Sequence, residues 1–362
     1  MSDDYYLLWL STLYAMGSRK QNALLEMFGS ARALHDANED LLRVTPGVTE
    51  QNVHAILNNR DPEKIKALIK LTEQLKMRFV SRFDAEFPKP LAEIPDPPVG
   101  VFFIGGLPGA NCPAVAVIGS RRCSEYGLTA ARIISKPLAA HGVAVISGMA
   151  RGIDSMAHRG AIEGGGKTVA VLGCGADICY PAENRSLREE IIANGCVLSE
   201  YPPGTTPMPS YFPVRNRIIS GLASITVVVE AGKKSGTLIT VDQALDQGRR
   251  VMAVPGNITS KLSEGTNALL AEGAEQVNGY KDILDALGIN EKADRGVSAP
   301  KSDKLAPQEK IVYDILTYEP KAFDEILDAA GGEAQTLHYL LTMLELKGYI
   351  KKIPGMRYIK NI

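Results

Sequence analysis

Seven short, uninterrupted apolar segments, separated by segments with helical periodicity, are the feature that most constrains this 362-residue chain. Strands without polar alternation are covered on both faces, as in parallel sheets. Strands and helices that alternate along a chain predict an α/β fold with a doubly wound, mostly parallel sheet. The apolar segments are VFFIG, AVAVIG, VAVIS, TVAVLG, CVLSE, ITVVVE and RVMAVPG. Helices are expected at about 127–141, 154–163, 183–194, 215–221, 236–247, 265–273 and 280–287.

The first part of the chain, residues 1–78, has helical periodicity throughout and predicts an all-helical domain before the sheet domain of 79–288. Its stretch TPGVTEQNVHAIL places a glycine turn before a helix. Such a unit resembles a helix-hairpin-helix or SAM-like element, which can present backbone amides to a DNA phosphate; a plain helical turn is the alternative. Five prolines in 88–100 disfavour a helix and a central strand, so this segment is expected to be an extended connection.

The last part of the chain has the pattern of a winged helix. A polar linker is expected at 289–304, followed in 305–362 by three helical segments and the hairpin YIKKIPGMRYI. This part carries seven Lys and Arg against eight Asp and Glu, and its third helix is nearly uncharged. A helix that reads a DNA groove normally presents Arg, Lys, Asn or Gln. Protein binding is therefore favoured slightly over phosphate contacts from Lys351, Lys352 and Arg357.

Net charge and cysteine content limit the kinds of binding site and the compartment that can be expected for this chain. The formal net charge is −1, so a nucleic-acid site must be a local basic patch. The five Cys form no CxxC pair, which indicates reduced thiols, a cytoplasmic location and no metal site. No run of about 18 apolar residues occurs, so a membrane span is not expected.

Three basic loops that contain glycine follow predicted strands. Glycine lets the backbone approach a ligand closely, hydroxyl and amide groups can donate to a phosphate, and Arg adds a bidentate charge. In a parallel sheet these loops meet at one edge, where they could bind several phosphates in a row. They match neither the dinucleotide-binding fingerprint nor a P-loop. The candidate residues are Gly119, Ser120, Arg121 and Arg122; Gly148, Arg151 and Gly152; and Lys233, Lys234, Ser235, Gly236 and Thr237.

A fourth segment, residues 207–221, combines aromatic and basic side chains. Aromatic rings beside arginines can stack a splayed base while the backbone charge is neutralised. Phe212 or Tyr211 is expected to stack on a base. The side chains expected to contact the nucleic-acid strand are Arg215, Asn216 and Arg217. The alternative is a helix start whose Phe packs in the core and whose arginines pair with acidic residues.

Other reactive side chains have simpler explanations. Asp154 and His158 have the spacing of an acid–base pair, but a helix cap and a local hydrogen bond are favoured. Glu230 is expected to pair with Lys233 or Lys234, and Ser235 or Thr237 to cap the next helix. Cys174 has no evident base and is expected to be an inert thiol.

These motifs together resemble the DNA processing protein A (DprA, or Smf) family over about residues 80–287. The matching segments are IGSRR, SGMARGIDSMAH, TVAVLGCGADICYPAENRSL, LSEYPPGTTP, FPVRNRIISGL, VVVEAGKKSGTLIT, VMAVPGNI and EGTNALLAEGA. The resemblance implies an extended Rossmann fold without a cofactor and a homodimer formed through it. It also implies binding and protection of single-stranded DNA, and loading of the RecA recombinase during natural transformation. Single-strand binding protein is a further implied partner, and the family's binding residues correspond to Gly119, Ser120 and Arg121.

An enzyme with a related core is the alternative. The stretch VVVEAGKKSGTLIT also resembles the P-G-G-x-G-T-x-x-E loop of nucleoside monophosphate phosphoribohydrolases. Aligning Gly236 and Thr237 with its G-T pair puts Thr240 in the place of the Glu. A Thr hydroxyl cannot act as a base near neutral pH. The loop is therefore expected to bind without turnover.

Overall fold

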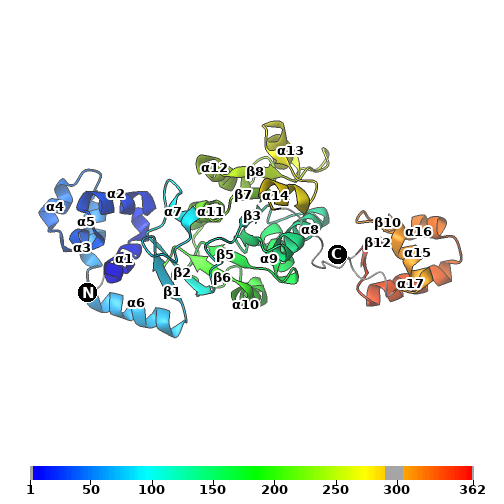
Figure 1. Cartoon of the computed structure of the whole chain (residues 1–362), viewed down its shortest axis with the longest axis horizontal. Coiled ribbons are helices and arrows are strands. Elements are labelled where there is room, and N and C mark those ends of the chain that lie inside the picture. The colour runs from blue at the N-terminus through cyan, green and yellow to red at the C-terminus, as the bar shows by residue number, and fades with distance from the viewer. Residues whose placement is uncertain (1–2, 290–304, 361–362) are drawn as a thin grey trace. The chain divides into compact units, whose positions relative to one another are not determined.

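The computed structural model describes residues 3–289 and 305–360, and the chain divides into two compact units, Met1–Asn290 and Glu291–Ile362 (Figure 1). The predicted linker 289–304 lies, apart from its first residue, outside the described residues. The N-terminal helices and the large sheet belong to the same compact unit. The boundary between 78 and 79 therefore stays a prediction.

The first unit is built on a nine-stranded sheet with the order β1-β2-β6-β5-β4-β3-β7-β8-β9. The seven predicted strands are confirmed. In the order of the sheet, β6, β5, β4, β3, β7, β8 and β9 each run parallel to their neighbours in this series. Two strands were not predicted, because β1 is short and half-exposed and β9 has only two residues. β2 pairs antiparallel with both β1 and β6. The strands are β1 Arg78–Ser81, β2 Gly100–Gly105, β3 Ala114–Ile118, β4 Ala144–Ser147, β5 Thr168–Leu172, β6 Cys196–Ser199, β7 Ile225–Val228, β8 Arg250–Ala253 and β9 Glu275–Gln276.

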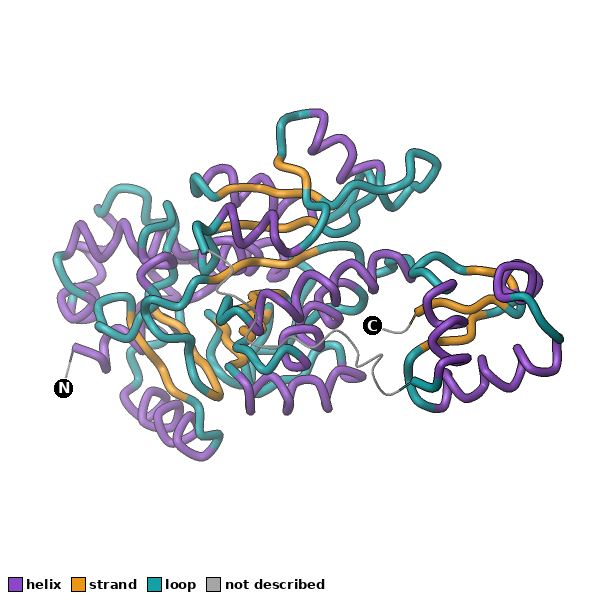
Figure 2. Tube along the Cα trace, turned by 45° about the vertical axis from the view of Figure 1, so that its right-hand side comes forward, coloured by secondary structure: helices purple, strands orange, loops and turns teal. Residues whose placement is uncertain are grey.

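Helices cover both faces of this sheet, which explains the continuous apolar strands (Figure 2). Along β3, Val115 and Val117 pack in a cluster with α8, α9 and α14, whereas Ala116 and Ile118 pack in a cluster with α7, α11 and α12. Every β3 side chain is thus removed from water, whichever face it points to. The helices are α7 Lys89–Ala92, α8 Glu125–Ala140, α9 Ile153–Glu163, α10 Arg185–Asn194, α11 Tyr211–Gly221, α12 Thr237–Asp246, α13 Glu264–Ala271 and α14 Tyr280–Ala286.

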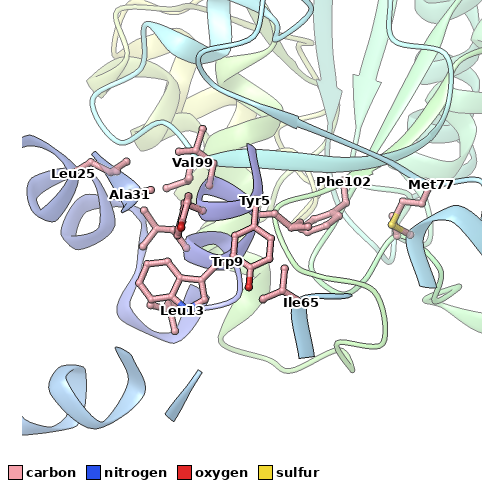
Figure 3. Close-up of a cluster of buried hydrophobic side chains, with 14 of the residues drawn as sticks. Tyr5, Trp9, Leu13, Leu25, Ala31, Ile65, Met77, Val99 and Phe102 are labelled. Carbon is pink, nitrogen blue, oxygen red and sulfur yellow. The ribbon is translucent and has the colours of Figure 1, made fainter. Parts of the chain in front are cut away.

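The N-terminal helices share a hydrophobic core with the sheet. Trp9 of α1 is fully buried, and Figure 3 shows it beside Tyr5 and Ile65, with Phe102 of β2 nearby. All four residues belong to one cluster. The predicted helical character of this part is confirmed. The elements are α1 Asp3–Ser11, η1 Tyr14–Met16, α2 Ser18–Phe28, α3 Ala31–Asp36, α4 Glu39–Val44, α5 Glu50–Asn58 and α6 Pro62–Gln74.

The proline-rich segment 88–100 is not extended throughout, as it was expected to be. Residues Lys89–Ala92 form the short helix α7, with Pro90 in its first turn. Amides in the first turn of a helix have no intrahelical acceptor, so proline is tolerated there. The prediction overlooked this position-dependent tolerance.

The second unit is a winged helix with its own core, as predicted. Ile326, Leu341 and Leu344 are buried together in it. Its elements are α15 Pro307–Ile315, β10 Lys321–Ala322, α16 Phe323–Ala330, α17 Ala334–Leu346, β11 Ile350–Ile353 and β12 Arg357–Lys360. Among the described residues of both units, no helix combines the length and apolar character needed to cross a membrane.

Candidate nucleic-acid interface

A pocket of about 590 Å³, called the main pocket here, opens at the carboxyl ends of the parallel strands. Its walls are the loops after β3, β4, β5 and β7 and the start of α11. This is the edge where ligands of doubly wound sheets bind. Ten predicted site residues line it: Gly119, Ser120, Arg121, Arg122, Phe212, Arg215, Asn216, Ser235, Gly236 and Thr237.

The remaining predicted residues lie around this pocket or away from it. Gly148 and Arg151 line a smaller cavity of about 50 Å³, which shares Arg121, Phe212 and Arg215 with the main pocket. Gly152 has a φ of 76°, and a Cβ there would lie 2.5 Å from the Ser120 carbonyl oxygen. Only glycine therefore lets the second loop pack against the first. Lys233 and Lys234 are exposed and do not line the main pocket, and neither does Arg217.

Phe212 is the centre of a cluster of aromatic and cationic groups. The guanidinium carbons of Arg121 and Arg215 lie 5.5 Å and 5.9 Å from the centre of its ring. A Cβ added at Gly173 would lie 3.0 Å from the ring, so the ring lies directly over the end of β5. Of the two predicted stacking residues, Phe212 lines the main pocket. Tyr211 stacks on Tyr201 instead, with ring centres 4.5 Å apart.

Tyr180 is a pocket residue that the sequence analysis missed. Its ring centre lies 5.4 Å from that of Phe212, and 44% of the residue is exposed. It lines both the main pocket and the smaller cavity. The signal was present, because Tyr180 follows β5 at the same edge of the sheet as the three basic loops. In the sequence the aromatic–basic pattern is visible within residues 207–221 alone, whereas in the structure this segment and the loop after β5 combine to form it.

Arg121, like its neighbour Arg122, is an exposed cation in the lining of the main pocket. It is exposed, and no carboxylate in the described part of the chain forms an ion pair with it. The rest of its loop is engaged internally, since the Ser120 amide donates to the Glu230 carbonyl oxygen at 2.8 Å. The Ser120 hydroxyl accepts from the Arg122 amide at 3.2 Å. The amide and the hydroxyl of Ser120, which were expected to be free to bind a phosphate, therefore already form hydrogen bonds within the protein.

The Arg215 side chain is buried and holds two backbone segments of the pocket wall together. It is 4% exposed, and its Nη1 donates to the carbonyl oxygens of Gly148, at 3.0 Å, and of Val171. Burial lowers the pKa of its guanidinium to about 10, which leaves it charged at neutral pH. Arg215 thus ties the loop after β4 to strand β5 and places a buried positive charge beneath Phe212.

Arg217 is a structural residue, as the alternative interpretation of its segment expected. It is 3% exposed and pairs with Glu200 at 2.6 Å and Asp96 at 3.3 Å. Because α11 turns by about 100° per residue, Arg217 points away from the face that carries Arg215. The pair with Asp96 connects α11 to the proline-rich segment. The prediction that Arg217 contacts DNA has no support in this geometry.

Two carboxylates differ from expectation. Asp154 does not cap α9, which begins after Gly152; it lies in the first turn and accepts from the amides of Gly148 at 3.2 Å and Ala150 at 3.4 Å. Burial raises the pKa of Asp154, and the charge of Arg215 opposes that rise. Glu230 accepts from the Ser124 amide at 2.9 Å and the Ser124 hydroxyl at 2.5 Å, so it holds the start of α8 rather than pairing with the neighbouring lysines.

The other side chains considered are held locally. His158 is fully buried, with its Nδ1 2.7 Å from the Thr168 hydroxyl, and burial lowers its pKa to about 3. Burial raises the pKa of the Cys174 thiol to about 11, which agrees with an inert thiol. The cap of α12 is Gly236, not Ser235 or Thr237, although the Ser235 hydroxyl accepts from the Thr237 amide at 3.2 Å. The described residues contain no cluster of three or more His, Cys, Asp or Glu that could hold a metal.

The chain matches two family models. Residues 78–288 match the model described as DNA recombination-mediator protein A, and residues 297–356 match the DprA winged helix domain. Protein Smf from Synechocystis sp. is 30% identical over 390 aligned residues, which cover 98% of each chain.

Two solved structures agree with this fold. DNA processing protein A from Streptococcus pneumoniae matches with a TM-score of 0.67 at 34% identity, over 79% of this chain and 98% of that one. DNA processing protein A from Helicobacter pylori, whose structure concerns its single-stranded DNA binding mode, matches with a TM-score of 0.52 at 27% identity, over 59% and 95% of the two chains. The arrangement of loops at the sheet edge and both family models lead to one conclusion: this chain belongs to the DNA recombination-mediator protein A family.

Proposed function

We propose that this protein binds single-stranded DNA in the main pocket and delivers it to a recombinase. The observation that carries the proposal is the exposed Arg121 guanidinium beside the Phe212 ring in a pocket at the carboxyl edge of the sheet. A cation and an aromatic ring side by side can neutralise a phosphate and stack the neighbouring base. The single-stranded DNA binding described for the Helicobacter pylori relative supports the same ligand.

Family membership is the basis for a proposal about the cellular role. We propose that the protein protects incoming single strands in the cytoplasm and loads RecA onto them during natural transformation. A homodimer formed through the Rossmann-like domain would present two pockets to one strand, and single-strand binding protein would be a further partner. Family membership supports these roles, while the geometry of the pocket supports the DNA-binding step itself.

We propose that the pocket binds without catalysing a reaction. Thr240, which replaces the Glu of phosphoribohydrolases, lines the pocket and is 3% exposed. Among the described residues that line the pocket, Asp154 is the one carboxylate; it is 7% exposed, and two backbone amides donate to one of its oxygens. A general base needs a lone pair aimed at the substrate. The alternative, a nucleotide hydrolase, would require turnover of a mononucleotide by this protein.

The test is binding of labelled single- and double-stranded oligonucleotides across a salt series, with a mononucleotide-cleavage assay beside it. We expect tight single-strand binding, a salt slope of several phosphates and no cleavage. Arg121→Ala should weaken binding and flatten the slope by about 0.7 for one lost phosphate contact. Arg159→Ala removes an exposed arginine of α9 that does not line the pocket and is the matched control. Unchanged binding by Arg121→Ala would exclude the pocket as the site.

A further inference from the structure

We propose a second nucleotide subsite beside the main pocket, at the carboxyl end of β6, where the N-terminal helices close a cavity of about 350 Å³. The cavity is lined by residues of the loop after β6, among them Pro202 and Pro203, and by Tyr14, Lys64 and Leu68 of the N-terminal part. The inference rests on the proposed single-strand binding and extends the path of the strand. Its ligand is a further nucleotide of the same DNA strand.

The position of the cavity follows from the strand order. β6 is the parallel neighbour of β5, and adjacent strands lie about 4.8 Å apart. Phe212 lies over Gly173 at the end of β5, and the next residue, Tyr211, stacks on Tyr201, which follows β6. Two consecutive residues of α11 therefore cover the ends of two consecutive strands. Phe212 lines the main pocket. The loop that lines the second cavity begins directly after Tyr201, the residue on which Tyr211 stacks.

Aromatic rings connect the two cavities. The Tyr14 ring, which lines the second cavity, meets Tyr201 edge-on at 5.5 Å and Tyr211 edge-on at 6.0 Å. A strand that leaves Phe212 would meet the Tyr211 side of α11 first and then Tyr14. Sequence-tolerant single-strand sites use successive aromatic surfaces of this kind, because every base has a flat face to stack.

The lining suits a base and its phosphate. Pro202, Pro203 and Leu68 offer apolar surface, Lys64 offers a cation, and no Asp or Glu is among the described residues that line the cavity. The Lys64 ammonium donates to the Asn58 carbonyl oxygen at 3.2 Å. No carboxylate in the described part of the chain forms an ion pair with Lys64, whereas Lys66 of the same helix lies 2.8 Å from a Glu63 carboxylate oxygen. An apolar wall with one cation that no carboxylate neutralises favours a polyanion with flat bases over a basic peptide.

The cavity is preformed, because the helix that carries Lys64 is anchored in the core. Ile65, the next residue, is 2% exposed and lies in the cluster with Trp9 and Phe102 (Figure 3). Asn22 strengthens the same interface, accepting from Arg82 and donating to the Pro97 carbonyl oxygen, both at 2.9 Å. Binding would therefore not require ordering of a loose domain, which would cost affinity.

The experiment compares oligothymidylates of increasing length by fluorescence anisotropy, with a salt series at each length. The proteins are the full-length wild type, Lys64→Gln and the matched control Lys70→Gln. Lys70 is exposed on the same helix but does not line the cavity. Both substitutions remove one surface charge and leave the core intact.

We expect the shortest strands, which fill only the main pocket, to bind all three proteins equally. Longer strands should bind more tightly to the wild type and to Lys70→Gln, whereas Lys64→Gln should lose this gain and show a salt slope shallower by about 0.7 for one phosphate. Identical length dependence in Lys64→Gln and the wild type would overturn the subsite. The proposed function fails in a different way: Arg121→Ala would then bind strands of every length as the wild type does.

Discussion

The guanidinium carbon of Arg121 lies 5.5 Å from the centre of the Phe212 ring, although 91 positions separate the two residues in the chain. Arg121 comes from the loop after β3 and Phe212 from the first turn of α11, and both line the main pocket. Arginine is suited to this contact because its planar guanidinium can face a ring while its edge binds a phosphate. Charge and shape at this position are therefore separable by mutation.

The first prediction separates them. Arg121→Lys keeps the positive charge but loses the planar group, so the salt slope should stay near that of the wild type while single-strand affinity falls several-fold. A titration of one oligonucleotide at several salt concentrations measures both quantities. Wild-type affinity in Arg121→Lys would mean that charge alone is recognised.

The second prediction concerns Tyr180, which offers exposed aromatic surface beside Phe212. Tyr180→Ala should weaken single-strand binding by about 1–3 kcal/mol, the usual contribution of one stacked base, and Tyr180→Phe should not. A strand that contains 2-aminopurine reports stacking directly through quenching of its fluorescence. Phe83→Ala, which truncates another exposed aromatic residue that does not line the main pocket, should leave the quenching unchanged.

The third prediction concerns Glu183, which forms an ion pair with Arg151 at the edge of the smaller cavity. Both side chains are exposed, so the pair itself contributes little to folding stability. Glu183→Gln should release Arg151 to a phosphate, raise single-strand affinity and steepen the salt slope by about 0.7. The same substitution made together with Arg151→Ala should bring no gain, and a gain in that double variant would refute the explanation.

The fourth prediction concerns the buried His158. Its pKa in the folded protein is about 3, below the value of 6.5 for the unfolded chain. Between these values the unfolded chain binds a proton that the folded protein does not, so this residue lowers the free energy of unfolding as the pH falls from 6.5 towards 3. The slope from one proton is about 1.4 kcal/mol per pH unit. His158→Asn should make the pH dependence of urea-induced unfolding shallower over this range, and an unchanged slope would contradict the assignment.

The seven central strands and the winged-helix unit were predictable because each has a local signal, a continuous apolar run in the strands and a helical period followed by a hairpin in the winged helix. The three basic loops were predictable for a related reason, since parallel strands bring their carboxyl ends to one edge. The inward direction of Arg217 and the anchoring role of Arg215 were not predictable, because they depend on partners far away in the chain, such as Asp96 and Gly148. Tyr180 differs from these two, because its position after β5 was a usable signal, although its partner Phe212 lies in another segment.

The core shared by the N-terminal helices and the sheet limits how this protein can be divided. Trp9 and Phe102 are both fully buried in one cluster, although they lie on opposite sides of the predicted domain boundary. A fragment that begins at residue 79 would expose the Phe102 side of that cluster to water and would be prone to aggregate. Engineering of a minimal DNA-binding fragment should therefore cut the chain after Asn290, the last residue of the first compact unit, and keep the first helix in place.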